Sequence, residues 1–160
     1  MNAPGEVSYR LALAKGFLAE AEQDITLERW RSCVDNSQLT VENVGKTALA
    51  LFGVPPKTHD PVRQIAAFLR EQTLPQEIQL VLQQMLPDLL ALGQREHILT
   101  DYGDEQTFTL PWDLFTQQSA KDALQTAQRC VQAVQGLLSL VEAWRGSQGD
   151  ETNGSLITEN

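Results

Sequence analysis

Cysteine, histidine and aromatic residues are scarce in this 160-residue chain. It contains two cysteines and two histidines, and only 6% of its residues are aromatic. Cys33 and Cys130 are far apart in the sequence and neither belongs to a CxxC pair, which argues against a zinc site or a disulfide-rich scaffold. Both lie within apolar helical patterns, so the sequence predicts two buried thiols in a reducing compartment.

Long apolar runs are also missing. No stretch approaches the roughly 20 consecutive apolar residues that a membrane-spanning helix needs. Residues 1–5 carry neither the basic segment nor the apolar segment of a signal peptide. These absences predict a soluble, cytoplasmic protein with no membrane partner.

Basic residues are outnumbered. Twelve Lys and Arg residues stand against 21 Asp and Glu residues, which gives a formal net charge of −9. Broad binding to nucleic acid depends on Lys and Arg neutralising phosphates, so this balance argues against a surface that coats DNA or RNA. A local basic pocket remains compatible with this net charge.

Motifs that carry catalysis or bind cofactors are absent as well. The chain has no G-x-S-x-G nucleophile motif and no complete phosphate-binding loop. Asp101, Asp104 and Glu105 do not have the spacing of a calcium loop. The sequence therefore predicts no catalytic residue, no cofactor and no metal site.

The chain has many apolar residues at helical spacing. Residues recur at steps of three and four, the period of an amphipathic helix. The predicted helices cover residues 6–23, 26–52, a short segment from Pro61, 75–95 with a kink or break at Pro87, and 116–144. Residues 96–115 are predicted to be a long connection, because Asp, Gly and Pro punctuate them.

These patterns predict an all-α fold. Long two-sided helices cannot bury their apolar stripes alone, so they must pack as an antiparallel, up-and-down helical bundle of four to five helices. The predicted bundle covers residues 6–145. Residues 146–160 are rich in Gly, Ser, Asn and Thr and are predicted to form a disordered tail.

Glu42 and Lys46 form the first candidate pair for a functional site. They are four residues apart and therefore share one helix face. One interpretation is a surface ion pair, worth about 0.3 kcal/mol. The other is that Lys46 supplies a positive charge to a nucleotide phosphate or to an acidic group of a partner, with Glu42 in support.

A second candidate group precedes the third helix. Asp60 is a good N-cap and Pro61 suits the first helical position. Lys57 and His59 lie just before them, where the N–H groups of the helix N-terminus favour anions. The alternative is that His59 only orders the turn through a hydrogen bond to the backbone or to Asp60.

Arg95 and Tyr102 are weaker ligand-binding candidates. Arg95 ends a predicted helix, where a cation offsets the negative end of the helix dipole. Tyr102 lies in the predicted connection, where its ring has the chemistry to stack on a base. Both also have purely structural interpretations.

Together these segments resemble a known family. Residues 41–49 read Val-Glu-Asn-Val-Gly-Lys-Thr-Ala-Leu, and Gly53, Pro55-Pro56 and residues 57–60 (Lys-Thr-His-Asp) follow. The arrangement is similar to that of HEPN domains (higher eukaryotes and prokaryotes nucleotide-binding), over residues 8–144. Gly103-Asp104 and the residues before the Ala-rich last helix add to the resemblance.

The resemblance implies several properties. Members are commonly homodimers and often act beside a minimal nucleotidyltransferase, in some cases as a toxin–antitoxin pair. Other members cleave RNA and carry an Arg-x4–6-His motif, which neither His59 nor His97 completes here. The resemblance therefore favours a non-catalytic module that binds a nucleotide or substrate. The alternatives are a diverged HEPN ribonuclease or toxin, and a helical dimerisation protein without a ligand.

Overall fold

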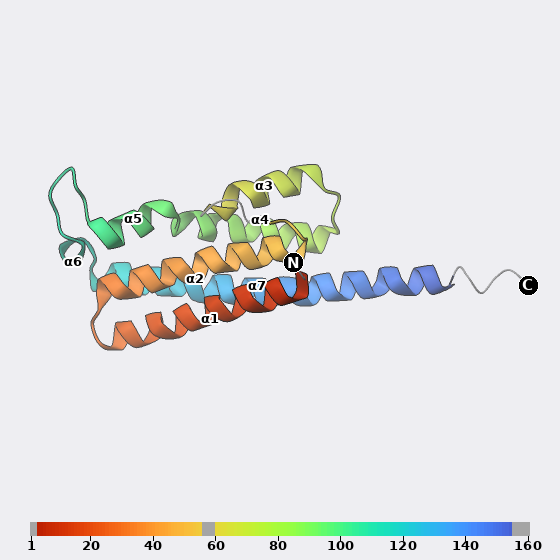
Figure 1. Cartoon of the computed structure of the whole chain (residues 1–160), viewed down its shortest axis with the longest axis horizontal. Helices are drawn as coiled ribbons and strands as arrows, with labels where there is room; N and C mark the ends of the chain where they lie inside the picture. The colour runs from red at the N-terminus through yellow and green to blue at the C-terminus, as the bar shows by residue number, and fades with distance from the viewer. Residues whose placement is uncertain (1–2, 56–59, 155–160) are drawn as a thin grey trace, which may run out of the picture.

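In this computed structural model the chain forms an all-α bundle, as the sequence predicts (Figure 1). The structure describes residues 3–55 and 60–154. Within these ranges no strand forms, and a single isolated bridge joins Asp104 to Thr109. The helices are α1 (Ala3–Thr26), α2 (Trp30–Leu51), α3 (Pro61–Glu71), α4 (Gln76–Ala91), α5 (Gln94–Tyr102), α6 (Pro111–Leu114) and α7 (Gln117–Gly154).

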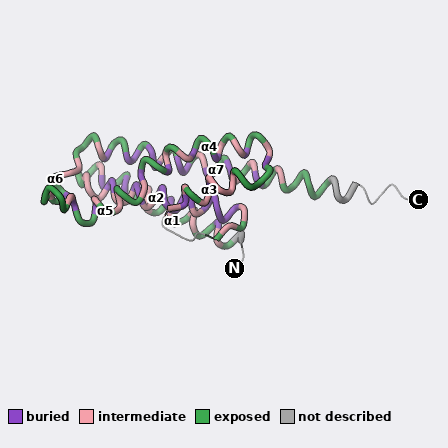
Figure 2. The backbone as a smooth tube through the Cα atoms, turned by 90° about the horizontal axis from the view of Figure 1, so that it is seen from above, coloured by how far each residue is buried: buried purple, intermediate pink, exposed green. Residues whose placement is uncertain are grey.

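The long helices reverse direction along the chain, and α2 lies at their centre (Figures 1 and 2). Helix α2 contacts every other helix, whereas α1 contacts only α2 and α7 within the described ranges. Buried side chains of α1, α2, α3, α4 and α7 make up most of one continuous core; its largest members are Leu49, Ile65, Ile78, Leu82 and Leu137. None of the helices in the described ranges is both long and apolar enough to cross a bilayer.

The turn between α1 and α2 sets the start of α2. Asp24 is 7% exposed, and its carboxylate accepts hydrogen bonds from Ser32 Oγ (2.7 Å) and Asn36 Nδ2 (2.8 Å). Glu28 adopts a positive φ of 57° in the same turn. The predicted helix start at residue 26 therefore moves to Trp30, because the chain reverses through this network first.

The predicted end of α2 and the predicted start of α3 are both confirmed. Gly53 has a φ of 68° after α2, a conformation that favours glycine. Asp60 Oδ1 accepts a hydrogen bond from the Val62 N–H (3.2 Å), and Pro61 occupies the first position of α3.

Two predictions for this part of the chain were wrong at least in part. The break predicted as one alternative at Pro87 does not occur: helix α4 continues through Pro87, because residues on both sides of it, such as Leu82, Met85 and Leu89, are buried in the core. Residues 94–102 form α5 rather than a connection. Glu96 Oε2 accepts a hydrogen bond from the Gly93 N–H (3.1 Å), and this local cap starts a new helix.

Helix α7 also differs from the prediction. Its 38 residues span about 57 Å, so it extends beyond the rest of the bundle (Figure 1). Residues 146–154 are helical where the composition predicted a tail, because an existing helix grows without a new nucleation step. Residues 155–160 lie outside the described ranges.

The two cysteines are buried and unpaired with each other, as predicted. The pKa of the Cys33 thiol is raised to about 11 and that of the Cys130 thiol to about 12, mainly because both thiols are buried. Both thiols are therefore protonated near neutral pH and act as small apolar groups in the core.

Candidate functional site

Glu42 and Lys46 form a close ion pair on α2. Lys46 Nζ lies 2.7 Å from Glu42 Oε1, and the side chains are only 13% and 8% exposed. The interpretation as an ordinary surface ion pair is therefore wrong in one respect: both groups have lost most of their water. Such a pair has a much larger desolvation cost than an exposed one.

Gln38 extends this polar line by one helical turn, and the sequence interpretation missed it. The side chain is 2% exposed, and its Nε2 donates weakly to Glu42 Oε2 at 3.4 Å. Its Oε1 has no hydrogen-bond partner among the described residues. The signal was available: positions 38, 42 and 46 repeat every four residues and so occupy one helix face.

This polar line borders a narrow crevice between α2, the start of α3 and the end of α4. The crevice has a volume of about 10 Å³ and is lined by Gln38, Val41, Glu42, Asp60, Pro61, Val62, Leu89, Leu92 and Gly93. That is about the space that one water needs. A nucleotide cannot enter it, so any larger ligand would bind across its mouth.

Gly45 explains why α3 begins so close to α2. A Cβ atom at this position would overlap Pro61 Cγ and lie 2.8 Å from Pro61 Cβ. Only glycine allows the two helices to approach in this way. Gly45 thus allows the start of α3 to lie beside the polar line of α2.

Asp60 is the one member of the second candidate group that the structure describes. It is half-buried, caps α3 and lines the crevice with Glu42. Lys57 and His59 lie outside the described residues, so their predicted role in an anion site stays a prediction.

The structure does not bring Arg95 and Tyr102 together, because they lie near opposite ends of α5. Arg95 is exposed in the first turn of α5, so the prediction that it offsets a helix C-terminus is wrong. Tyr102 is 69% exposed at the other end of α5. Thr100, two residues before it, bonds to Asp35, which lies about 16 Å along α2 from Lys46.

A second feature that the sequence interpretation missed lies at that far end. Arg31 donates a hydrogen bond to the Thr100 carbonyl (3.0 Å), and its guanidinium lies 5.8 Å from the centre of the Trp112 ring. An open hollow of about 580 Å³ is lined by Glu28, Arg29, Trp30, Arg31, Ser32 and Trp112. Trp112 is 68% exposed, and its contact with Arg31 joins α6 to α2.

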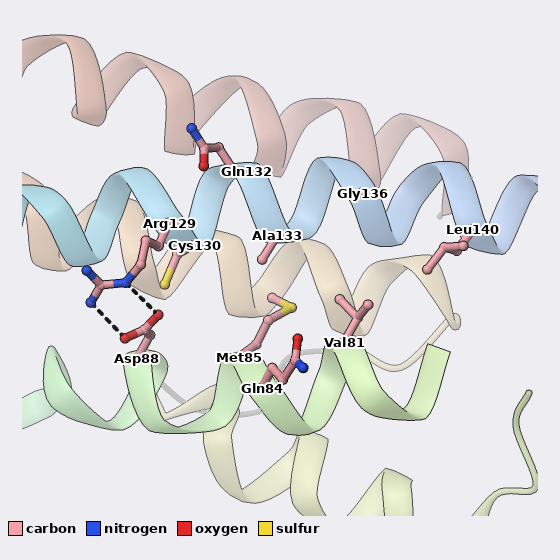
Figure 3. Close-up of a pocket in the computed structure, with 10 residues that line it drawn as sticks. All are labelled: Val81, Gln84, Met85, Asp88, Arg129, Cys130, Gln132, Ala133, Gly136 and Leu140. Carbon is pink, nitrogen blue, oxygen red and sulfur yellow. Dashed lines mark hydrogen bonds and ion pairs between the residues drawn. The ribbon is translucent and has the colours of Figure 1, made fainter. Parts of the chain in front are cut away.

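A third concave region is a groove between α4 and α7 (Figure 3). Its volume is about 520 Å³, and Val81, Met85, Ala133 and Leu140 give it an apolar floor. Arg129 and Asp88 close one end through two hydrogen bonds of 3.0 and 3.2 Å. The bond to Asp88 raises the pKa of the Arg129 guanidinium, which stays charged.

None of these three regions resembles a metal centre. The described residues contain no group of three or more His, Cys, Asp or Glu side chains that could hold a metal ion. What the crevice offers instead is the amide of Gln38 and the carboxylates of Glu42 and Asp60, with the ammonium group of Lys46 paired to Glu42 beside it.

The fold and this crevice define an antiparallel helical protein whose second helix carries a buried polar line. A comparison with protein families finds a match to the HEPN domain over residues 7–137. The chain therefore belongs to the HEPN domain family, as its sequence pattern predicted.

The comparison with solved structures supports the fold. The chain is similar to the crystal structure of TT1696 from Thermus thermophilus, with a TM-score of 0.67 and 19% sequence identity. The match covers 86% of this chain and 99% of that one. No curated protein matches the sequence.

Proposed function

We propose that this HEPN protein is a non-catalytic binding module that presents the crevice beside Glu42 and Lys46 to a nucleotide or to a substrate of a minimal nucleotidyltransferase. In this proposal the partner enzyme holds the metal and performs phosphoryl transfer. The cytoplasmic location, the homodimer and a toxin–antitoxin role remain predictions from the sequence.

The observation that carries the proposal is the buried polar line Gln38–Glu42–Lys46. Burying an amide, a carboxylate and an ammonium group on successive turns carries a desolvation cost. Apolar residues of similar size at these positions would not carry it. Groups kept at such a cost, at the edge of a crevice, are candidates for recognition. Among the described residues no donor reaches Gln38 Oε1, so this buried oxygen is an acceptor that they leave unused.

The same charges support binding rather than cleavage. Cleavage of a phosphodiester needs a positioned proton carrier and a cation at the scissile phosphate. Lys46 already pairs with Glu42, and Asp60 adds a second carboxylate to the crevice. The chain also lacks the Arg-x4–6-His motif of the RNA-cleaving members.

Isothermal titration calorimetry with ATP and with the other nucleoside triphosphates tests the first half of the proposal. We expect binding by the wild type and a loss of at least about tenfold in affinity for Lys46→Ala. Lys15→Ala, on the exposed side of α1, is the matched control and should bind as the wild type does. No heat with any nucleotide would exclude nucleotide binding.

A pull-down with a minimal nucleotidyltransferase encoded beside this gene tests the second half. If neither a nucleotide nor such an enzyme binds, the proposal fails. Incubation with RNA completes the test: cleavage that disappears in both Lys46→Ala and His59→Ala would identify a ribonuclease instead.

A further inference from the structure

The hollow beside Trp112 lies apart from the crevice of Glu42 and Lys46. It forms where α1 turns into α2, and α6 lies at the same end of the bundle and contributes Trp112 (Figure 1). Arg31, which lines the hollow, is about 22 Å along α2 from Lys46. The volume of about 580 Å³ is in the range of sites that hold small organic ligands. The hollow is therefore a second candidate site, independent of the proposed function.

Two arginines that line this hollow have no carboxylate partner. Arg10, Lys46 and Arg129 each form an ion pair with an acidic side chain. Arg29 and Arg31 form no such pair with any described residue, although Arg31 is half-buried. A partly desolvated guanidinium without a carboxylate beside it is a candidate for binding an anion from outside the chain.

The contacts that hold Arg31 leave most of its donors unused. One of its N–H groups donates to the Thr100 carbonyl (3.0 Å), and its Cζ atom lies 5.8 Å from the centre of the Trp112 ring. A guanidinium has five N–H donors, so several remain for a ligand. Arg29 is exposed, and its side chain does not cap α2. A carboxylate can accept paired N–H bonds from such a group, so it suits both arginines.

The charges around the hollow favour an anion with a single charge. Arg29 and Arg31 stand against Glu28 among the lining residues, which gives the lining a formal charge of +1. Asp24 adds a negative charge nearby, where its carboxylate accepts a hydrogen bond from the lining residue Ser32. The whole chain has a formal charge of −9. A carboxylate matches this balance, whereas a phosphate group with two or more charges meets stronger repulsion.

We propose that this hollow binds a carboxylate carried by a ligand with a planar apolar ring, either a free aromatic acid or an aromatic residue at the C-terminus of a peptide. The carboxylate accepts hydrogen bonds from Arg29 and Arg31, and the ring packs against Trp112. The indole is 68% exposed, so much of its surface is available to a ring of the ligand. Two unpaired arginines beside an exposed tryptophan supply the contacts that this ligand chemistry requires.

NMR titration of the tryptophan side-chain N–H signals tests the proposal with three probes of similar size: phenylacetate, phenylacetamide and phenyl phosphate. The chain has three tryptophans, and Trp112→Phe assigns the signal of Trp112. We expect phenylacetate to shift this signal and to bind at least about tenfold more tightly than phenylacetamide, which lacks the charge. Phenyl phosphate, measured at about pH 7.5 where it is mostly a dianion, should bind more weakly than phenylacetate.

Substitution of each arginine tests the predicted contacts. Arg29→Gln and Arg31→Gln should each weaken phenylacetate binding by about tenfold, because each removes a charge-assisted hydrogen bond. Arg70→Gln is the matched control, because Arg70 is also exposed but lies in the last turn of α3 and does not line the hollow. Arg31 also contacts Trp112, so Arg29→Gln keeps the test decisive if Arg31→Gln displaces α6. Circular dichroism must show equal helix content in the variants.

Three results would overturn the proposal. One is that no probe shifts the Trp112 signal. The second is that phenylacetamide or phenyl phosphate binds as tightly as phenylacetate. The third is that Arg70→Gln weakens binding as much as Arg29→Gln does.

A short peptide distinguishes the two sources of the carboxylate. Acetyl-Ala-Ala-Phe with a free C-terminus is compared with the same peptide as its C-terminal amide, by the same NMR titration. Binding of the acid but not of the amide would identify the chain end of a peptide as the ligand. Binding of phenylacetate without binding of either peptide would identify a free aromatic acid.

Discussion

Helices α1 and α2 have nearly the same length and pack against each other, yet the protein uses them differently. Helix α2 has 15 buried residues among its 22, on nearly every side. Helix α1 buries one stripe and leaves the rest to solvent. Most polar groups on α2 must therefore find a partner inside the protein, whereas most of those on α1 have water available. Asp24, near the end of α1, is an exception, because it is buried and bonded to Ser32 and Asn36.

The two helices even contain matched features. Each has an ion pair with the acid four residues before the base, at 2.7 Å for Glu42–Lys46 and 2.8 Å for Glu6–Arg10. Each also has an internal glycine, Gly45 or Gly16, with opposite surroundings. The comparison teaches that the same sequence feature has a large or small energetic role according to what surrounds its helix.

The largest expected effect is at Gly45. The substitution Gly45→Ala should lower the free energy of unfolding by about 3 kcal/mol, because the added methyl group overlaps the Pro61 ring. Urea denaturation measures the change. The matched substitution Gly136→Ala on α7 should instead stabilise the protein by about 0.5 kcal/mol. A neutral result at Gly45 would show that α3 moves away from α2 without cost.

Removal of the buried lysine should have the next largest effect. Lys46→Met removes the ammonium group that lies 2.7 Å from the Glu42 carboxylate, which is 8% exposed, and we expect a loss of about 2 kcal/mol. Chemical denaturation at low and high salt measures it. If the crevice is a binding site, nucleotide affinity falls as well. A change below about 0.5 kcal/mol would mean that this pair behaves as a surface pair.

Alkaline pH should weaken the α2–α7 contact moderately. The pKa values of Cys33 and Cys130 rise to about 11 and 12 on folding, from an ordinary value of 9.0. The folded state therefore retains thiol protons that the unfolded state loses above pH 9. Stability from these two groups is complete below pH 9 and declines as the pH rises toward 11 and 12.

Thermal unfolding across this range, with a Cys33→Ala/Cys130→Ala protein as the control, measures the thiol contribution. The wild type should lose more stability than the control above pH 9. Labelling by a thiol reagent sharpens the contrast with α1: a cysteine at the exposed position of Ala19 should react rapidly at pH 8, and the native thiols only after unfolding. Rapid labelling of Cys33 would contradict its burial.

The smallest effect should come from the ion pair of α1. Arg10→Met should change the free energy of unfolding by only about 0.3 kcal/mol, because the side chains of Glu6 and Arg10 are 19% and 24% exposed and water can solvate either one alone. Denaturation of Arg10→Met beside Lys46→Met gives the comparison directly. Equal losses in the two variants would remove the distinction between the helices.

Local patterns predicted much of this fold. Asp60-Pro61 correctly marked the start of α3, and Gly53 the end of α2, because caps and positive φ angles depend on adjacent residues. The same reasoning failed at residues 96–102, where Asp101 and Gly103 suggested a loop. There Glu96 caps α5, and Thr100 is held by Asp35 and Arg31 of α2, contacts that no local pattern shows.

The candidate site was predictable only in part. The spacing of Glu42 and Lys46 placed them on one face, and the pairing at 2.7 Å follows from it. Their burial, the adjoining amide of Gln38 and the separation from Tyr102 could not be predicted. These depend on where α3 and α5 pack along α2, which involves residues distant in the sequence.

The sequence by itself determined the helical class, the family and the chemical character of the chain: acidic, poor in metal ligands and without the RNA-cleaving motif. Only the tertiary structure decided which helix is central and which polar groups lose their water. The physical reason is that helix periodicity is a property of neighbouring residues, whereas desolvation depends on every element that packs around a side chain. The contrast between Gly45 and Gly16 is one result of that difference.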